Sequence, residues 1–256
     1  MVIAQGDNST ARTASGSDSG TASLHPQAAA WQVGSDVLTL FPTFVWKLQL
    51  AKALQESIAN GLMSVLGEQR GRNASLSPGE CWQSIQTLHE QERLGELVSC
   101  IHAATRRVLN FLKTTHADFE ITGCWANILA PGTGHTIHHH PNNYLSGVYY
   151  VATWRGADTI NFHDPRIQTG IIRPPVTELT SGNTDLVVVR VQNGTLLLFP
   201  SYLPHSVTAN RSDKERISVS FNIMFSHFTE RLSQPLWEPA AQSSGGRAGE
   251  PCRPAT

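Results

Sequence analysis

Two kinds of hydrophobic periodicity divide the chain. Between residues 90 and 113 apolar side chains recur at spacings of three, four and seven, which predicts an amphipathic helix. Residues 52–66 also favour a helix. An earlier run, 37–50, is expected to be a strand that bends at Pro42, because proline cannot donate a hydrogen bond to a neighbouring strand.

From residue 121 the pattern changes to short β-prone runs separated by Gly, Pro, Asn and Asp. We expect strands at 121–129, 145–154, 158–163, 185–191, 194–199, 205–208 and 215–225. Two helices followed by about seven short strands predict a mainly β domain, a sandwich or barrel with helices on one flank.

The last of these runs, RISVSFNIMF, alternates strictly between apolar and polar side chains. Because successive residues of a strand point to opposite faces, one face is apolar and the other polar. We expect the apolar face to pack on the helices and the polar face to line a cavity. The apolar positions are Ile217, Val219, Phe221 and Ile223, and the polar ones are Arg216, Ser218, Ser220 and Asn222.

The two ends of the chain have a different composition. Residues 1–30 and 233–256 are rich in small and polar residues and poor in large apolar ones, so both are expected to be disordered. The remaining 31–232 are expected to form a single domain, since 256 residues can bury one substantial core.

Charge and targeting signals narrow the function classes. A formal net charge of -1 at pH 7 gives no field that would attract nucleic acid or an anionic membrane, so we expect neither as a partner. The four cysteines show no CxxC pair, no run is apolar enough to span a membrane, and the first residues do not resemble a signal peptide. We therefore expect a cytoplasmic protein with a small ligand. A homodimer is possible.

The histidines cluster in a way that indicates a metal site. In the segment GHTIHHHPNN, His138 and His140 are two residues apart, so in an extended chain they share a face while His139 points away. His205 opens a later predicted strand and could complete the site from a neighbouring one. Three nitrogen ligands on one side of an ion leave positions open for a substrate or O₂. The alternative for the HHH run alone is a solvated loop.

Arg216 and Ser218 follow His205 on one face of the last predicted strand. A guanidinium is permanently charged and planar, so it suits a carboxylate, and a neighbouring hydroxyl can donate a further hydrogen bond to that carboxylate. The alternative is a surface ion pair between Arg216 and Glu215 or Asp213. Buried without a carboxylate partner, Arg216 would be costly, and a ligand carboxylate removes that cost.

The combination of HxH, a distal histidine and Arg-x-Ser resembles the 2-oxoglutarate/Fe(II)-dependent oxygenase superfamily. Five strings, in the same order, look like a bacterial and phage subgroup of it, and they cover about residues 38–227: LFPTFVW, WANILAPGTGHTIHHHPNNYLSGVYYV, INFHDPR, LLFPSYLPHSVTAN and ERISVSFNIMF. The resemblance implies a double-stranded β-helix, the jelly roll or cupin-like fold, that uses Fe(II), 2-oxoglutarate as cosubstrate and O₂.

The resemblance also implies roles for particular residues. His138 and His205 match the two histidine ligands of the superfamily, and Arg216 matches the residue that binds the far carboxylate of 2-oxoglutarate, with Ser218 beside it. The superfamily's usual carboxylate ligand is absent, and His140 stands in its position. Either His140 binds the metal, as the i, i+2 spacing favours, or Asp164 of the HDP turn does so instead.

Three further residues are candidates for the pocket. Asn127 is placed to hydrogen-bond the cosubstrate, although it could equally satisfy backbone groups at a strand edge. Tyr149 and Tyr150 must point to opposite faces, and parity does not say which of them lines the pocket.

The resemblance implies oxidation of a C–H bond of a small molecule, amino acid or peptide, with hydroxylation as the default and with release of succinate and CO₂. Two other classes remain open. One is a cupin-type metal enzyme without 2-oxoglutarate, an isomerase or thiol dioxygenase, which would not need an inward-pointing Arg216. The other is a non-catalytic module that binds a small acid.

Overall fold

The computed structural model describes residues 2–4, 36–70, 75–114, 118–166 and 174–229. The chain divides into two compact units, one made of Met1–Ala4 with Phe44–Thr256 and the other of Gln5–Thr43. In the second unit, residues 36–43 form neither helix nor strand. Residues 233–256, and 1–30 apart from the short strand β1 (Val2–Ala4), lie outside the described residues, so the predicted disorder of both ends stays a prediction.

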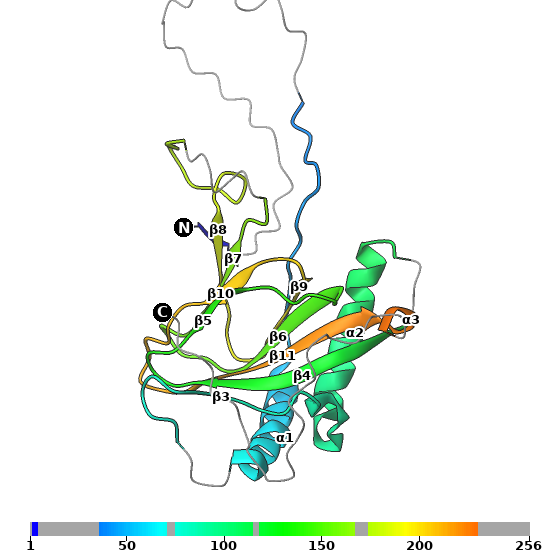
Figure 1. Ribbon diagram of the computed structural model, residues 1–256, viewed down its shortest axis with the longest axis vertical. Coiled ribbons are helices and arrows are strands. Elements are labelled where there is room, and N and C mark those ends of the chain that lie inside the picture. The colour runs from blue at the N-terminus through cyan, green and yellow to red at the C-terminus, as the bar shows by residue number, and fades with distance from the viewer. Residues whose placement is uncertain (1, 5–35, 71–74, 115–117, 167–173, 230–256) are drawn as a thin grey trace, which may run out of the picture. The chain divides into compact units, whose positions relative to one another are not determined.

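Two sheets build the larger unit (Figure 1). The five-stranded sheet has the order β1-β8-β7-β10-β5, and the six-stranded sheet has the order β2-β9-β6-β11-β4-β3. The smaller sheet contains β5 (His135–His138), β7 (Thr159–His163), β8 (Leu186–Arg190) and β10 (His205–Val207). The larger contains β2 (Trp46–Gln49), β3 (Cys81–Gln83), β4 (Phe119–Leu129), β6 (Leu145–Ala152), β9 (Thr195–Pro200) and β11 (Arg216–Phe225). The domain is the mainly β jelly roll, the double-stranded β-helix, that was expected.

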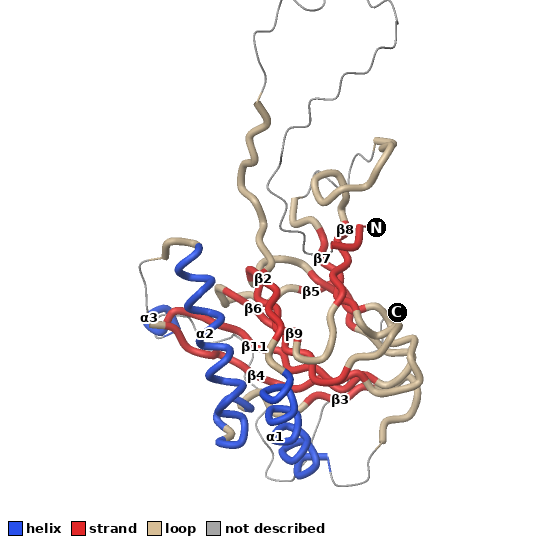
Figure 2. Tube along the Cα trace, turned by 180° about the vertical axis from the view of Figure 1, so that it is seen from behind, coloured by secondary structure: helices blue, strands red, loops and turns tan. Residues whose placement is uncertain are grey.

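The helices lie against the larger sheet, as the tube view from behind shows (Figure 2). They are α1 (Lys52–Arg70) and α2 (Gly95–Phe111), with two 3₁₀ turns, η1 (Leu88–Glu90) and η2 (Glu92–Leu94), before α2 and a short α3 (Ser226–Thr229) after β11. None of the helices among the described residues is long and apolar enough to cross a membrane.

The β11 alternation has the predicted result. Ile217, Val219, Phe221 and Ile223 pack in one core cluster with helix residues such as Leu62 of α1 and Ile101 of α2. A second cluster fills the space between the sheets and includes Phe162 of β7, Phe199 of β9 and Tyr150 of β6. The polar face of β11 therefore points toward the inside of the jelly roll.

The structure differs from the sequence prediction at several places. The run 37–50 forms a strand only at Trp46–Gln49, beyond Pro42, which has no N–H to donate. The predicted helix 90–113 begins only at Gly95, since the preceding turns are 3₁₀. The strands β1, β3 and β5 were not predicted, because three or four residues are too few for an alternation to be recognised.

Candidate functional site

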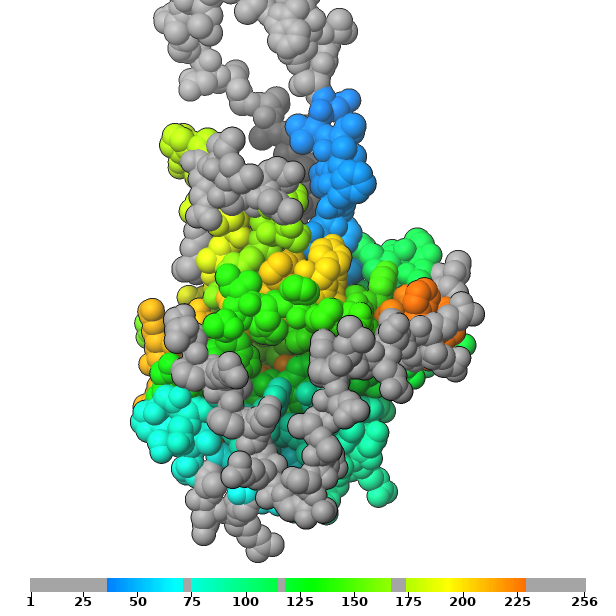
Figure 3. Space-filling view, viewed as in Figure 1, coloured from blue at the N-terminus to red at the C-terminus, as the bar shows by residue number. Residues whose placement is uncertain are grey.

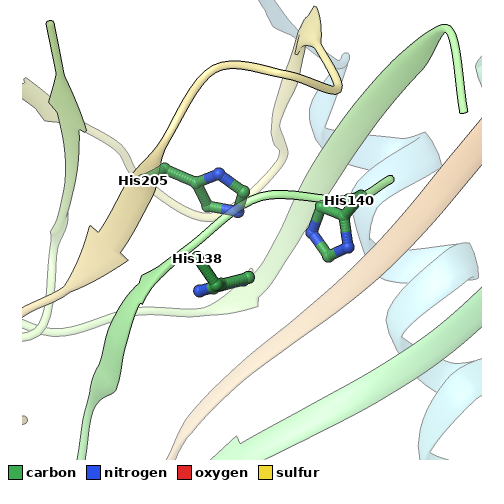
Figure 4. Close-up of side chains that lie close together, drawn as sticks. All are labelled: His138, His140 and His205. Carbon is green, nitrogen blue, oxygen red and sulfur yellow. The ribbon is translucent and has the colours of Figure 1, made fainter. Parts of the chain in front are cut away.

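Three histidines converge between the two sheets (Figure 4). His138 ends β5, His140 follows two residues later and His205 begins β10, which pairs directly with β5 so that His205 faces His138. One ligand nitrogen from each ring lies within 4.8 Å of the other two. His139 is exposed, as the alternation predicted.

Hydrogen bonds orient two of these rings. Nδ1 of His205 lies 3.0 Å from the carbonyl oxygen of Leu203, and Nδ1 of His138 lies 2.8 Å from that of Thr136. A carbonyl oxygen can only accept a hydrogen bond, so each Nδ1 carries the proton. Each Nε2 is therefore unprotonated, and its lone pair is available to bind a metal. This backbone support is typical of metal-binding histidines.

Burial keeps the rings of His140 and His205 neutral in the absence of metal. Burial lowers the pKa of His140 to about 4, and the neighbouring His138 and His139 lower it further. Burial also lowers the pKa of His205 to about 3, with His138 acting in the same direction. Neutral imidazoles are the form that binds metals, so this donor set fits a divalent transition metal.

Asp164, the alternative third ligand, is engaged elsewhere. Its carboxylate accepts hydrogen bonds from Nε and Nη2 of Arg166, the shorter at 2.6 Å, and these bonds lower its pKa. Among the described residues, His138, His140 and His205 form the one group with a geometry suited to a metal. The geometry thus favours His140 over Asp164.

His135 also reaches this site, which spacing alone does not predict. The β5–β10 pairing contains an irregularity: His138 pairs with His205, whereas His135 pairs with Val207, so between these pairs two residues of β5 oppose one residue of β10. Such a bulge lets residues three apart turn toward the same side. The rings of His135 and His138 are 6.1 Å apart, and burial lowers the pKa of His135 to about 4, aided by the charge of Arg216.

Arg216, the first residue of β11, is fully enclosed. It is 2% exposed, and its guanidinium carbon lies 5.1 Å from the centre of the Tyr150 ring. Within the described part of the chain, no carboxylate pairs with it, and neither its Nε nor the Tyr150 hydroxyl makes a hydrogen bond of normal geometry. Burial lowers the pKa of Arg216 and raises that of Tyr150 to about 12. The carboxylate of Glu215 pairs with Arg70 instead, so Arg216 does not form the alternative surface ion pair with Glu215.

The register of β11 shows which tyrosine faces inward. Ser218 pairs with Tyr150 of β6 and with Asn127 of β4, whereas Tyr149 pairs with Val219. Tyr150 therefore shares the inner face with Arg216, and Tyr149 belongs to the core cluster with the helices. Ser218 is itself buried, at 3% exposure.

A cavity of about 260 Å³ opens beside the histidines. Figure 3 shows the surface hollowed between green residues and the cyan residues around β3. His135, His138 and His140 form one part of the wall. The rest of it is formed by Gln83, Trp125, Asn127, Gly134, Thr136 and Ser220. Arg216 and Ser218 do not line this cavity; they continue the face of Ser220 into the closed interior.

Asn127 links two cavity residues. Its Nδ2 donates to Oγ of Ser220 at 3.0 Å, and its Oδ1 accepts from Nε2 of Gln83 at 3.4 Å. The amide is thus bonded to side chains and not to backbone groups at a strand edge. Gln83 was missed in the sequence because only the pairing of β3 with β4 brings it to Asn127.

Comparison with known proteins agrees with this geometry. Residues 123–222 match a family model described as "Putative 2OG-Fe(II) oxygenase". This segment contains all three histidines, Asn127, Arg216 and Ser218. No curated protein matches the chain in sequence.

Solved structures share the fold at low identity. The non-heme alpha ketoglutarate dependent carbocyclase SnoK from nogalamycin biosynthesis has a TM-score of 0.53 and 15% identity, covering 75% of this chain and 87% of that one. A prolyl hydroxylase from Trichoplax adhaerens, in complex with a hypoxia inducible factor peptide fragment, has a TM-score of 0.52 and 16% identity, covering 74% and 87%. The epimerase SnoN, in complex with Fe³⁺, alpha ketoglutarate and nogalamycin RO, has a TM-score of 0.52 and 13% identity, covering 82% and 91%.

At these identities the structures establish the jelly-roll fold, and the family model carries the assignment of the segment that holds the site. Residues 123–222 are thus similar to the 2-oxoglutarate- and Fe(II)-dependent oxygenases, enzymes whose cofactors are Fe(II) and 2-oxoglutarate.

Proposed function

We propose that this oxygenase hydroxylates an unactivated C–H bond of a small molecule, an amino acid or a peptide. In this reaction 2-oxoglutarate, O₂ and the substrate give succinate, CO₂ and the hydroxylated product. We assign His138, His140 and His205 as the Fe(II) ligands. The observation that carries the proposal is Arg216, a buried guanidinium with no carboxylate partner among the described residues.

The unpartnered guanidinium supports a dicarboxylate cosubstrate in preference to metal chemistry alone. An uncompensated buried charge is costly, so its presence indicates an anion that binds in the functional state. Arg216 would hold the far carboxylate of 2-oxoglutarate, with the Ser218 hydroxyl beside it on β11. Asn127, across from Ser218, would orient the cosubstrate from β4.

The bound iron and cosubstrate supply the oxidising chemistry, and the protein supplies geometry and exclusion of water. His205 and His138 hold their rings with Nε2 directed inward, through the backbone contacts of their Nδ1 atoms. Phe162 and Phe199 pack around His205, with ring centres 6.3 and 4.8 Å away, and keep that side of the site apolar.

A three-histidine site also changes the charge balance. All three ligands are neutral, so Fe(II) and Arg216 together exceed the charge of the 2-oxoglutarate dianion by one positive charge. A site with the usual carboxylate ligand would be neutral by the same count. The excess positive charge favours tight binding of the dianion.

An anaerobic titration with Fe(II) and 2-oxoglutarate tests the proposal. The wild-type chain is expected to develop the weak visible charge-transfer band of the chelated cosubstrate. Arg216→Ala should weaken 2-oxoglutarate binding by about 100-fold, since a charge-assisted bidentate contact is lost. Arg216→Lys retains the charge but not the planar fork, so it should show an intermediate loss.

His140→Ala separates the metal from the cosubstrate contacts. It should lower Fe(II) affinity strongly, whereas Asp164→Ala should leave it unchanged because that carboxylate pairs with Arg166. If Asp164→Ala abolished metal binding while His140→Ala did not, the ligand assignment would be wrong. Absence of any 2-oxoglutarate binding in the folded, metal-loaded wild type would contradict the proposed function as a whole.

A further inference from the structure

The wall of the cavity offers hydrogen-bonding groups that the protein itself does not use. Gln83 makes one side-chain hydrogen bond in the described part of the chain, donated by its Nε2 to Asn127, so its Oε1 remains available as an acceptor. The Ser220 hydroxyl accepts from Asn127 and donates to no described residue, so its O–H remains available as a donor. Both side chains line the same cavity.

These two groups are held in place by the amide between them. Asn127 is 3% exposed and contacts Gln83 on one side and Ser220 on the other, so the three form one row across β3, β4 and β11. A row whose ends expose one acceptor and one donor is complementary to a ligand that presents one N–H and one C=O. That is the pattern of a carboxamide or peptide group.

The charges around the cavity exclude one class of ligand. None of the described residues that line it is a carboxylate, and the positive charge of the Arg216 guanidinium acts on His135 in its wall. An ammonium group placed here would lose its hydration without gaining an anionic partner, beside a centre that already carries excess positive charge. Trp125 adds an aromatic wall, its ring 5.8 Å from that of His140.

We infer that the primary substrate of this oxygenase is uncharged where it enters the cavity and presents an amide group to Gln83 and Ser220. The substrate class is therefore an N-acylated or peptide-linked residue and not a free amino acid. This inference rests on the proposed function, because it assumes that the cavity is the entrance to the oxidised C–H bond. It assigns Gln83 and Ser220 as specificity-determining residues.

A matched pair of probes tests this selection. N-acetyl-L-leucine N-methylamide and L-leucine N-methylamide differ in the acetyl group that removes the ammonium charge, and the same pair can be made from valine and phenylalanine. Binding is measured by calorimetry on the full chain loaded with Zn(II) and 2-oxoglutarate, which does not turn over. The acetylated probe is expected to bind at least about tenfold more tightly, the effect of one unpaired or unmade polar interaction.

Two variants in the cavity wall and one control outside it test whether the cavity determines the preference for the acetylated probe. Gln83→Glu has the same shape but adds a negative charge, so it should shift the preference by about tenfold or more toward the ammonium probe. Gln86→Glu makes the same change at an exposed position outside the cavity and should leave the preference unchanged. Ser220→Ala should weaken the acetylated probe about threefold to tenfold while 2-oxoglutarate affinity stays the same.

The outcomes distinguish this inference from the function beneath it. If Zn(II) and 2-oxoglutarate bind in an Arg216-dependent manner but the ammonium probes bind as well as the acetylated ones, the inference is overturned and the oxygenase function stands. The inference is also overturned if no acetylated probe binds, or if Gln83→Glu and Gln86→Glu behave alike. Loss of 2-oxoglutarate binding itself would instead count against the proposed function.

Discussion

Both faces of β11 are largely buried but have opposite chemistry. On the helix side Val219 and Phe221 are 0% exposed, and on the inner side Arg216 and Ser218 are 2% and 3% exposed. The helix side is packed by apolar side chains of the core cluster. The inner side retains polar atoms without partners, such as Nε of Arg216. Burial alone therefore does not separate the two faces of this strand; the unpartnered polar atom of Arg216 on its inner side does.

The largest change in stability is expected from a substitution on the helix side of β11. Phe221 lies over Gly147 of β6, and the contact is so close that a Cβ on Gly147 would collide with the ring. Phe221→Ala removes a fully buried aromatic side chain, so the free energy of unfolding should fall by about 3–5 kcal/mol. Urea denaturation measures this loss.

Ser220→Ala, the neighbouring substitution on the inner face, is the control. It should change the free energy of unfolding by less than about 1 kcal/mol, because the hydroxyl lines a cavity and packs no core. A larger loss in Ser220→Ala than in Phe221→Ala would show that the two faces do not divide stability and binding between them.

On the inner face, removal of a charged side chain should raise the free energy of unfolding, whereas Phe221→Ala lowers it. Arg216→Met keeps much of the volume but removes a buried guanidinium that lacks a carboxylate partner among the described residues. Without ligands, the free energy of unfolding should rise by about 1 kcal/mol or more. With 2-oxoglutarate and Zn(II) at about 100 times the dissociation constant, the wild type should gain about 2.7 kcal/mol, and the variant should gain much less.

Paired urea denaturation curves, with and without 2-oxoglutarate, provide this measurement. Lower stability of the ligand-free Arg216→Met variant would mean that the guanidinium is already compensated within the protein. It would thereby remove the observation on which the proposed function depends.

The sequence was sufficient for those features that depend on local periodicity. The alternation of β11 correctly separated Phe221 from Arg216, because strand geometry fixes which side each residue faces. His138 and His140 lie together, as predicted, although His140 is in the loop after β5, and His205 joins them through the pairing of β10 with β5. The prediction of strands after residue 121 was confirmed for the same reason.

The features of the site that the sequence did not predict depend on pairings between distant segments. His135 reaches the cavity through a bulge between β5 and β10, and the sequence of either strand alone does not encode that register. Gln83 reaches it because the three-residue strand β3 pairs with β4, 44 positions later in the chain. Parity required Tyr149 and Tyr150 to face opposite ways, but only the register with β11 showed which one points inward.

The smallest expected effect on stability is that of Tyr150→Phe. Tyr149 and Tyr150 compare the two faces of the sheet with identical side chains. The Tyr150 hydroxyl is buried without a hydrogen-bond partner of normal geometry, so Tyr150→Phe should change the free energy of unfolding by less than about 0.5 kcal/mol. Because that hydroxyl lies by the guanidinium of Arg216, its removal should nevertheless weaken 2-oxoglutarate binding about threefold to tenfold. The control is Tyr149→Phe, on the helix side, which should leave 2-oxoglutarate affinity unchanged. Anaerobic titration of both variants gives the two dissociation constants, and equal affinities would mean that the inner face does not extend to Tyr150 as a binding surface.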